Sequence, residues 1–182
     1  MKKTIKSLVA VCMLTAVCAM TSYGQNYQKG DKLLNVGIGL GGGVAPSGAK
    51  GIPPVGLSFE VGATDKISVG GYAGYSSAKQ TIAGWGGNWE YSYQYILVGA
   101  RGSYHFDFGV DKLDPYVGAV LGYNIASAKV TGAPAGTPTA SAGGFLWGGH
   151  AGARYMFSEK IGAFGELGYG ISYLTVGLAF KL

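Results

Sequence analysis

The sequence predicts an all-β protein, a closed antiparallel β-barrel of about eight strands in up-and-down order that crosses a membrane. The last ten residues carry Leu174, Val176, Leu178, Phe180 and Leu182 at every second position. Because successive side chains of a strand point to opposite faces, this segment has one apolar face and one face that is largely small or polar. About ten tilted residues also suffice to cross the hydrocarbon of a bilayer.

Composition favours many strands in one domain. The 182 residues include 34 Gly and 13 Tyr, only 13% are charged, and the mean hydropathy is +0.23. After the N-terminal segment there is no run of about 18 apolar residues, which a membrane-spanning helix needs. The chain is therefore expected to cross the membrane with strands.

Residues 1–24 are predicted to be a secretory signal peptide. Three lysines precede an apolar stretch over 8–20, and small and polar residues follow it. This order of charged, apolar and small segments is typical of export signals. Cleavage is expected after Gly24, with Ala19 as the alternative site, so that 25–182 form the barrel domain.

Removal of this segment changes both the cysteine content and the charge. Cys12 and Cys18 lie in it, and each follows a Val, unlike an acylated Cys, which stands behind small residues. The barrel domain therefore has no cysteine for a disulfide or a thiolate metal site. Three of the 14 Lys and Arg are also removed, which leaves 11 against 9 Asp and Glu. So small an excess does not indicate a nucleic-acid partner.

Eight segments show the period-two pattern and are separated by Gly, Pro and polar residues. They cover 33–40, 55–62, 67–76, 91–106, 116–129, 145–157, 161–169 and 173–182. The apolar faces of the first four consist of Leu34, Val36, Ile38 and Leu40; Val55, Leu57, Phe59 and Val61; Ile67, Val69, Ala73 and Tyr75; and Ile96, Val98, Ala100, Tyr104 and Phe106. Those of the next three consist of Val117, Ala119, Leu121, Tyr123 and Ile125; Phe145, Trp147, Ala151, Ala153, Tyr155 and Phe157; and Ile161, Ala163, Leu167 and Tyr169.

The connections are predicted to alternate in length. Long loops are expected over 41–53, 77–90 and 130–144, and shorter turns at 64–66, 107–114, 158–160 and 170–171. Barrels of bacterial outer membranes have short periplasmic turns and longer external loops. Both termini and the first three turns are therefore expected on the periplasmic side, and only the short last external connection departs from the rule. Aromatic residues near both ends of the strands predict two interfacial girdles.

This pattern resembles the small eight-stranded outer-membrane barrels, such as OmpX and the OmpA transmembrane domain, over essentially all of 25–182. The closing strand is similar to the C-terminal strand that the barrel-assembly machinery recognises. Phe180 and Leu182 stand at the signal positions, with Leu182 where the family usually has an aromatic residue. The resemblance implies an integral outer-membrane protein without a cofactor, whose partners are outer-membrane lipid and, during biogenesis, the assembly machinery and periplasmic chaperones.

Seven ionisable residues fall on the polar faces of the strands. They are Glu60, Arg101, His105, His150, Arg154, Glu166 and Lys181. Buried ionisable groups are costly unless they are paired, so a polar network in the lumen is predicted. The turn at 158–160 brings Arg154 and Glu166 onto neighbouring strands, within diagonal reach. Eight strands leave room only for side chains, which favours a closed plug; the alternative is a narrow solute or proton path.

No catalytic or metal-binding residue is predicted. Ser103 and His105 share one face of a strand, as in related barrels that hydrolyse or transfer acyl chains, but this face is inward and no acidic group can be placed beside them. The two histidines lie on separate strands without a nearby carboxylate cluster in sequence, which makes a poor metal site. Residues 37–42 match the dinucleotide fingerprint, yet prolines follow where the fingerprint needs a helix.

The predicted function is a structural or surface-interaction role in the outer membrane, without enzymatic activity. The loop 77–90, with Trp85 and Trp89, is the candidate contact surface for an extracellular ligand or a host surface, and a place for Trp89 in the headgroup layer is the alternative. The loop 130–144 is predicted to be a spacer. The alternative function is a narrow porin-like channel or a small-ligand uptake barrel. A soluble barrel similar to a lipocalin would turn its apolar face inward, and the alternation alone fits both orientations.

Overall fold

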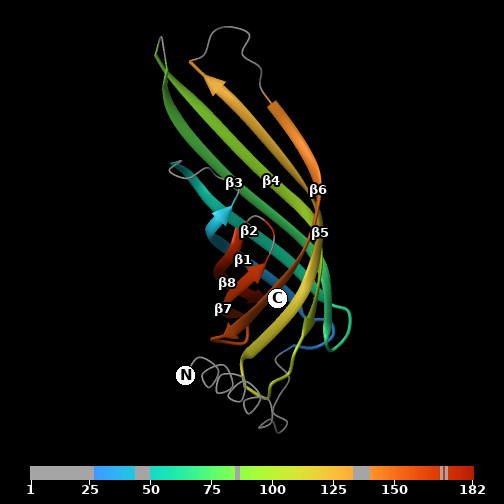
Figure 1. Ribbon diagram of the computed structural model, residues 1–182. Coiled ribbons are helices and arrows are strands. Elements are labelled where there is room, and N and C mark those ends of the chain that lie inside the picture. The colour runs from blue at the N-terminus through green and yellow to red at the C-terminus, as the bar shows by residue number, and fades with distance from the viewer. Residues whose placement is uncertain (1–26, 44–49, 85–86, 133–139, 169, 171) are drawn as a thin grey trace, which may run out of the picture.

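The computed structural model describes residues 27–43, 50–84, 87–132, 140–168, 170 and 172–182. They form a closed barrel in which each strand pairs antiparallel with the next and β8 pairs with β1 (Figure 1). The strands are β1 (Lys32–Gly43), β2 (Lys50–Gly62), β3 (Ile67–Gly84), β4 (Gly87–His105), β5 (Leu113–Thr131), β6 (Ala140–Met156), β7 (Ile161–Gly168) and β8 (Ser172–Lys181). The predicted fold class is confirmed. In the described part of the chain, no helix has the length and apolar character of a membrane span.

The strand register shows that the strands tilt in the barrel. Following directly paired residues round the barrel from Phe145 of β6 leads back to β6 at Tyr155, ten residues further along. The path passes through Tyr123, Val98, Ala73, Leu57, Val36, Leu178 and Ala163. Such a stagger requires strands that are inclined to the barrel axis. Side chains from strands that are not neighbours can therefore meet at one height in the lumen.

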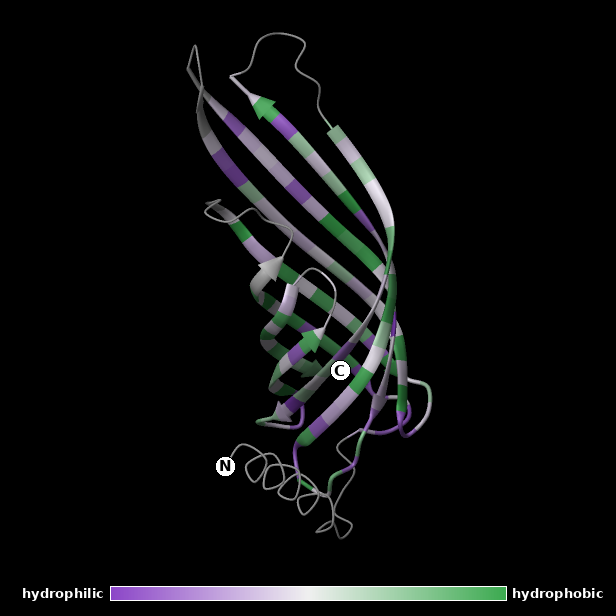
Figure 2. Ribbon diagram, in the orientation of Figure 1, coloured by the Kyte–Doolittle hydropathy of each residue, from purple (hydrophilic) through white to green (hydrophobic). Residues whose placement is uncertain are grey.

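The apolar faces of the strands point outward. Large apolar side chains such as Val98, Leu121 and Leu178 are exposed on the outside, whereas Glu60 and Arg101 are buried inside. Hydrophobic and hydrophilic residues alternate along the strands (Figure 2). A lipocalin-like soluble barrel requires the opposite orientation, so the structure excludes that alternative. An outer surface of this kind is suited to lipid.

The strands differ about twofold in length. β3, β4, β5 and β6 have 18, 19, 19 and 17 residues, but β7 and β8 have only 8 and 10. A tilted strand crosses a bilayer with about 9–11 residues. Because the turns at the other end are short, the extra length of β3 to β6 lies at one end of the barrel, where these strands rise beyond β7, β8 and β1 (Figure 1). We call this extension the protruding sheet.

The prediction of a long loop over 77–90 is wrong. Its described residues belong to β3 and β4, which stay paired up to Gly84 and Gly87. Beyond the bilayer both faces of a sheet meet water, so the apolar alternation ends although Tyr and Thr, which favour strands, continue. For the same reason the predicted loops 41–53 and 130–144 are too long, because β2 begins at Lys50 and β6 at Ala140.

A charge on the outer face should destabilise the barrel only where that face meets lipid. Leu121 lies between Val117 and Ile125 on the outer face of β5, and Ser127 lies on the same face towards the loop end. We expect Leu121→Arg to lower the free energy of unfolding from phospholipid vesicles by about 2–4 kcal/mol, and Ser127→Arg by about 0–1 kcal/mol. Denaturant unfolding followed by Trp fluorescence measures both. Equal effects would contradict the placement of Leu121 in the lipid-facing part of the outer surface and of Ser127 beyond it.

Candidate functional site

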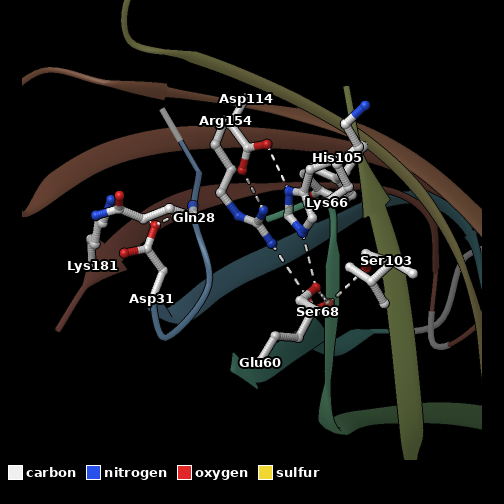
Figure 3. Close-up of polar contacts among 12 residues, drawn as sticks. Gln28, Asp31, Glu60, Lys66, Ser68, Ser103, His105, Asp114, Arg154 and Lys181 are labelled. Carbon is white, nitrogen blue, oxygen red and sulfur yellow. Dashed lines mark hydrogen bonds and ion pairs between the residues drawn. The ribbon is translucent and has the colours of Figure 1, made fainter. Parts of the chain in front are cut away.

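The candidate site is the polar network in the lumen, shown in part in Figure 3. All seven ionisable residues assigned to the polar faces point into the barrel: Glu60, Arg101, His105, His150, Arg154, Glu166 and Lys181. Six of them lie in the middle of the barrel, and Lys181 lies at the mouth next to the turns after β2, β4 and β6, here called the turn-side mouth. An eighth member, Asp114 at the start of β5, is 5% exposed.

Glu60 is the centre of the network and has no exposed surface. Its Oε1 atom lies 3.1 Å from Nε of Arg101 and 3.2 Å from Nη2 of Arg154. Its Oε2 atom accepts hydrogen bonds of 2.6 and 2.7 Å from the hydroxyls of Ser68 and Ser103. Two cations and two hydroxyls thus satisfy one carboxylate, which is what burial of a charge requires.

Each guanidinium also binds a second carboxylate. Arg101 makes two hydrogen bonds to Glu166, of 2.8 and 3.3 Å, and the Tyr116 hydroxyl donates another of 2.9 Å to Glu166. Arg154 donates to Asp114 over 2.8 Å and to Asn35 over 3.0 Å, and its Cζ atom lies 4.1 Å from the centre of the Tyr116 ring. With Ser68 of β3 bound to Glu60, the network joins all strands from β1 to β7 across the lumen.

The expected proximity of Arg154 and Glu166 does not lead to an ion pair. In the register of β6 and β7, Arg154 stands opposite Phe164, and Glu166 stands opposite Gly152. Arg154 crosses the lumen to Glu60 and Asp114, and Glu166 binds Arg101. Sequence analysis missed Asp114 because it placed the residue in a turn. The alternation of Asp114, Tyr116 and Gly118 on the inner face of β5 was the available signal.

His105 lies between an acid and a hydroxyl. Its Nδ1 atom is 2.7 Å from Oδ1 of Asp114, and its Nε2 atom is 2.9 Å from Oγ of Ser68. The expectation that no acidic group could be placed beside this histidine is therefore wrong. Ser, His and Asp stand in the order of a hydrolase triad, but Ser68 has no exposed surface and its hydroxyl donates to Glu60. This serine is unsuited to act as a nucleophile in the closed barrel.

The hydrogen bonds also assign the protons of both histidines. Ser68 and Ser103 each donate their one hydroxyl proton to Glu60, so each must accept from an Nε2–H, of His105 and His150 respectively. The Nδ1 atom of His105 lies against Asp114. The two guanidiniums of the network lie among three carboxylates, those of Glu60, Asp114 and Glu166.

The cavities beside the network are of water size. One, on the loop side, has a volume of about 20 Å³ and is lined by Tyr72, Arg101, His150 and Glu166 among others. A second, at the turn-side mouth, has a volume of about 10 Å³ and adjoins Tyr27. Each has room for about one water molecule. In the first, water is a suitable donor for Nδ1 of His150, which is buried without a protein partner.

The chain before β1 covers the turn-side mouth. Tyr27 is 3% exposed and stacks on His105, with ring centres 3.6 Å apart and planes 7° apart. Burial raises the pKa of Tyr27 to about 12, so the phenol stays neutral near the carboxylates. Asp31 binds Lys181 over 2.7 Å and accepts a hydrogen bond from the backbone N–H of Gln28. Sequence analysis missed this cover because a short polar segment has no periodicity to reveal it.

The other predicted residues lie elsewhere. Trp85 lies outside the described residues, and Trp89 is half-buried on β4, opposite Ile82 of β3. Phe180 pairs with Leu34 and Ile161, and Leu182 is exposed. The glycines at the start of the fingerprint segment are on the inner face of β1, where a Cβ atom at Gly37 would come within 2.8 Å of the Phe164 ring. These glycines therefore allow neighbouring side chains, such as that of Phe164, to pack closely against β1.

No group of three or more potential metal ligands occurs among the described residues.

Removal of the central charge should weaken the barrel strongly. Glu60→Gln leaves two buried guanidiniums without their shared carboxylate, and we expect it to lower the free energy of unfolding by about 3–5 kcal/mol. The matched control is Glu90→Gln, because Glu90 forms a solvent-exposed ion pair with Lys79 on the protruding sheet; its expected effect is below about 1 kcal/mol. Denaturant unfolding in detergent micelles compares the two. Similar small losses would show that the network does not hold the barrel together.

Comparisons with known proteins agree with this architecture. A search of curated protein sequences finds no match to the chain. Among solved structures, the outer membrane protein OprG from Pseudomonas aeruginosa is similar with a TM-score of 0.62 and 14% sequence identity, over 88% of this chain and 99% of that one. The N-terminal β-barrel domain of OprF from Pseudomonas aeruginosa is similar with a TM-score of 0.54 and 17% identity, over 85% and 98% of the two chains.

These structures share the fold, at identities too low to carry a function across. The family model described as outer membrane protein beta-barrel domain matches residues 9–178, which is most of the chain. Its match includes all eight strands of the barrel, apart from the end of β8. The chain therefore belongs to the outer membrane protein beta-barrel domain family, and its location is the outer membrane.

Proposed function

We propose that this protein is a non-enzymatic outer-membrane barrel with a closed lumen, and that it acts through contacts of its protruding sheet at the cell surface. The observation that carries the proposal is the length of β3 to β6, about twice that needed to cross the bilayer. A barrel with only a structural role in the membrane has no need of this extra length. The partner is an extracellular ligand or a host surface.

The orientation rests on the connections. The extended parts of β3 to β6 lie at the end opposite the turns after β2, β4 and β6, and the N-terminal segment at Asp31 meets β8 at Lys181 on the side of those turns. Short turns and both termini are periplasmic in barrels of this kind. We therefore place the protruding sheet outside the cell. Cleavage of a signal peptide after Gly24, delivery by chaperones and recognition of Phe180 and Leu182 by the assembly machinery complete the proposed route.

The protruding sheet also has a strand edge that suits contact. The pairing of β6 with β7 ends at His150 and Gly168, so the described part of β6 from Ala140 to Gly149 pairs with β5 only. An edge paired on one side offers backbone donors and acceptors to an added strand. Proteins commonly protect such edges, and an open one on this sheet supports an interaction role.

The alternative function, a narrow channel, is less well supported because the network occupies the lumen. We expect the purified, folded barrel to give no single-channel current in planar bilayers, since the Arg101–Glu166 pair lies across the lumen and the two described cavities next to the central charges each hold about one water molecule. A double variant, Arg101→Ala with Glu166→Ala, removes the pair and serves as the comparison. Regular current steps from the unaltered barrel would support the channel.

The orientation can be tested with single cysteines, because 25–182 contain none. Ser141 is exposed on the protruding part of β6, and Ser158 is exposed in the turn after β6. We expect a membrane-impermeant maleimide to label Ser141→Cys in intact cells and to label Ser158→Cys only after lysis. The reverse pattern would place the protruding sheet in the periplasm and would overturn the proposed function.

A further inference from the structure

Three tyrosines stand in a row on β4 where it enters the protruding sheet. They are Tyr91, Tyr93 and Tyr95, here called the tyrosine column. They lie on the same face of β4 as Leu97 and Arg101, which are buried in the lumen. The column therefore lies on the inner, concave face of the protruding sheet. The rings of Tyr91 and Tyr93 are nearly parallel, with centres 6.5 Å apart and planes 14° apart. All three tyrosines are half-buried.

The residues beside the column are mostly small. Tyr93 pairs with Ala78 of β3 and Ala128 of β5, and Tyr95 pairs with Ser76 and Ala126. The next strand, β6, continues these two rows with Ala140 and Ala142, both exposed. The tyrosines thus form a ridge that rises from a floor of small side chains, and this leaves room beside the rings.

This face carries hydroxyl and amide groups but no charge among its described residues. Lys79 and Glu90 form an ion pair of 2.9 Å. Because they alternate with the inward-facing residues of β3 and β4, they lie on the convex face. Gln80 pairs with Tyr91 and adds an amide at the outer end of the column. Aromatic rings that have an apolar face and a polar hydroxyl suit a ligand that also combines apolar faces with polar hydroxyl groups.

We propose that the tyrosine column binds a neutral, linear oligosaccharide that reaches the cell surface from outside. The C–H faces of sugar rings stack on tyrosine rings, and sugar hydroxyls exchange hydrogen bonds with phenol and amide groups. Alternate residues of a strand are about 6.6–6.8 Å apart, so a chain lying along β4 meets the three rings in succession. The proposal rests on the proposed function, because it requires the protruding sheet to be outside the cell.

The curvature of the sheet favours a slender ligand over a globular one. The protruding sheet continues the wall of an eight-stranded barrel, whose interior is only wide enough for side chains, and its inner face is correspondingly concave (Figure 1). A folded protein would meet the convex face or the open edge of β6. Sugar chains anchored in the surrounding membrane would likewise meet the convex face, whereas a free oligosaccharide can enter from above.

The test uses the full barrel in lipid nanodiscs with maltohexaose, cellohexaose and chitohexaose as neutral probes. We expect at least one probe to bind, as measured by saturation-transfer NMR and calorimetry. Tyr93→Ala should weaken this binding about tenfold through loss of a stacking ring, while Tyr93→Phe, which keeps the ring, should retain most of it. Gln94→Ala is the matched control, because Gln94 is the next residue on β4 and lies on the convex face; it should bind like the unaltered barrel.

The heat-modifiable gel shift of a folded barrel confirms that each variant is folded. The proposal is overturned if none of the three probes binds, if Tyr93→Ala binds as well as the unaltered barrel, or if only a sulfated heparin hexasaccharide or an extended peptide binds. Labelling of Ser141→Cys in intact cells tests the surface position of the protruding sheet separately from the oligosaccharide ligand. With that labelling intact, failure of the sugar probes removes the oligosaccharide and leaves the surface role in place.

Discussion

The shared carboxylate of Glu60 is the constraint on which the interior of this barrel depends. Two guanidiniums approach the same oxygen, and each is also bound to a second carboxylate, Asp114 or Glu166. A buried ion pair is weak evidence for net stability, but its partners cannot be removed singly without a large cost. The network therefore acts as one unit that fixes the positions of seven strands, β1 to β7, relative to one another.

The two ends of the lumen keep this unit away from water in different ways. At the turn-side mouth, Tyr27 stacks on His105 and the Asp31–Lys181 pair holds the segment in place. On the loop side, Leu97 and Val120 are 1% and 6% exposed and lie on inner faces next to the charges. Low local dielectric strengthens satisfied ion pairs and makes unsatisfied ones costly. A closed interior, in which each described carboxylate of the network has a cationic partner, is the consistent outcome.

The sequence predicts the side of the sheet on which a residue lies more reliably than the partner it binds. Alternation within one strand is enough to assign Glu60, Arg101 and Arg154 to the inner face. Partner choice depends on the stagger round the whole barrel, which no single strand encodes. The diagonal positions of Arg154 and Glu166 on β6 and β7 are therefore predictable, but the binding of Arg154 to Glu60 and Asp114 is not. The predicted strand ends differ from the structure for a related reason. The apolar alternation marks only the part of each strand that faces lipid, whereas the hydrogen-bonded pairing of the strands continues beyond it.

The inner face of β4 shows why the bore and the surface have separate roles. From the turn-side mouth it presents His105, Ser103 and Arg101, then the buried Leu97, and finally the tyrosine column. One strand thus passes from a paired polar interior through an apolar layer to an uncharged aromatic surface. A ligand on the column is separated from the charges by that layer, so binding there has no direct route to the network. Recognition and closure can therefore coexist on one strand, and this favours a function outside the bore.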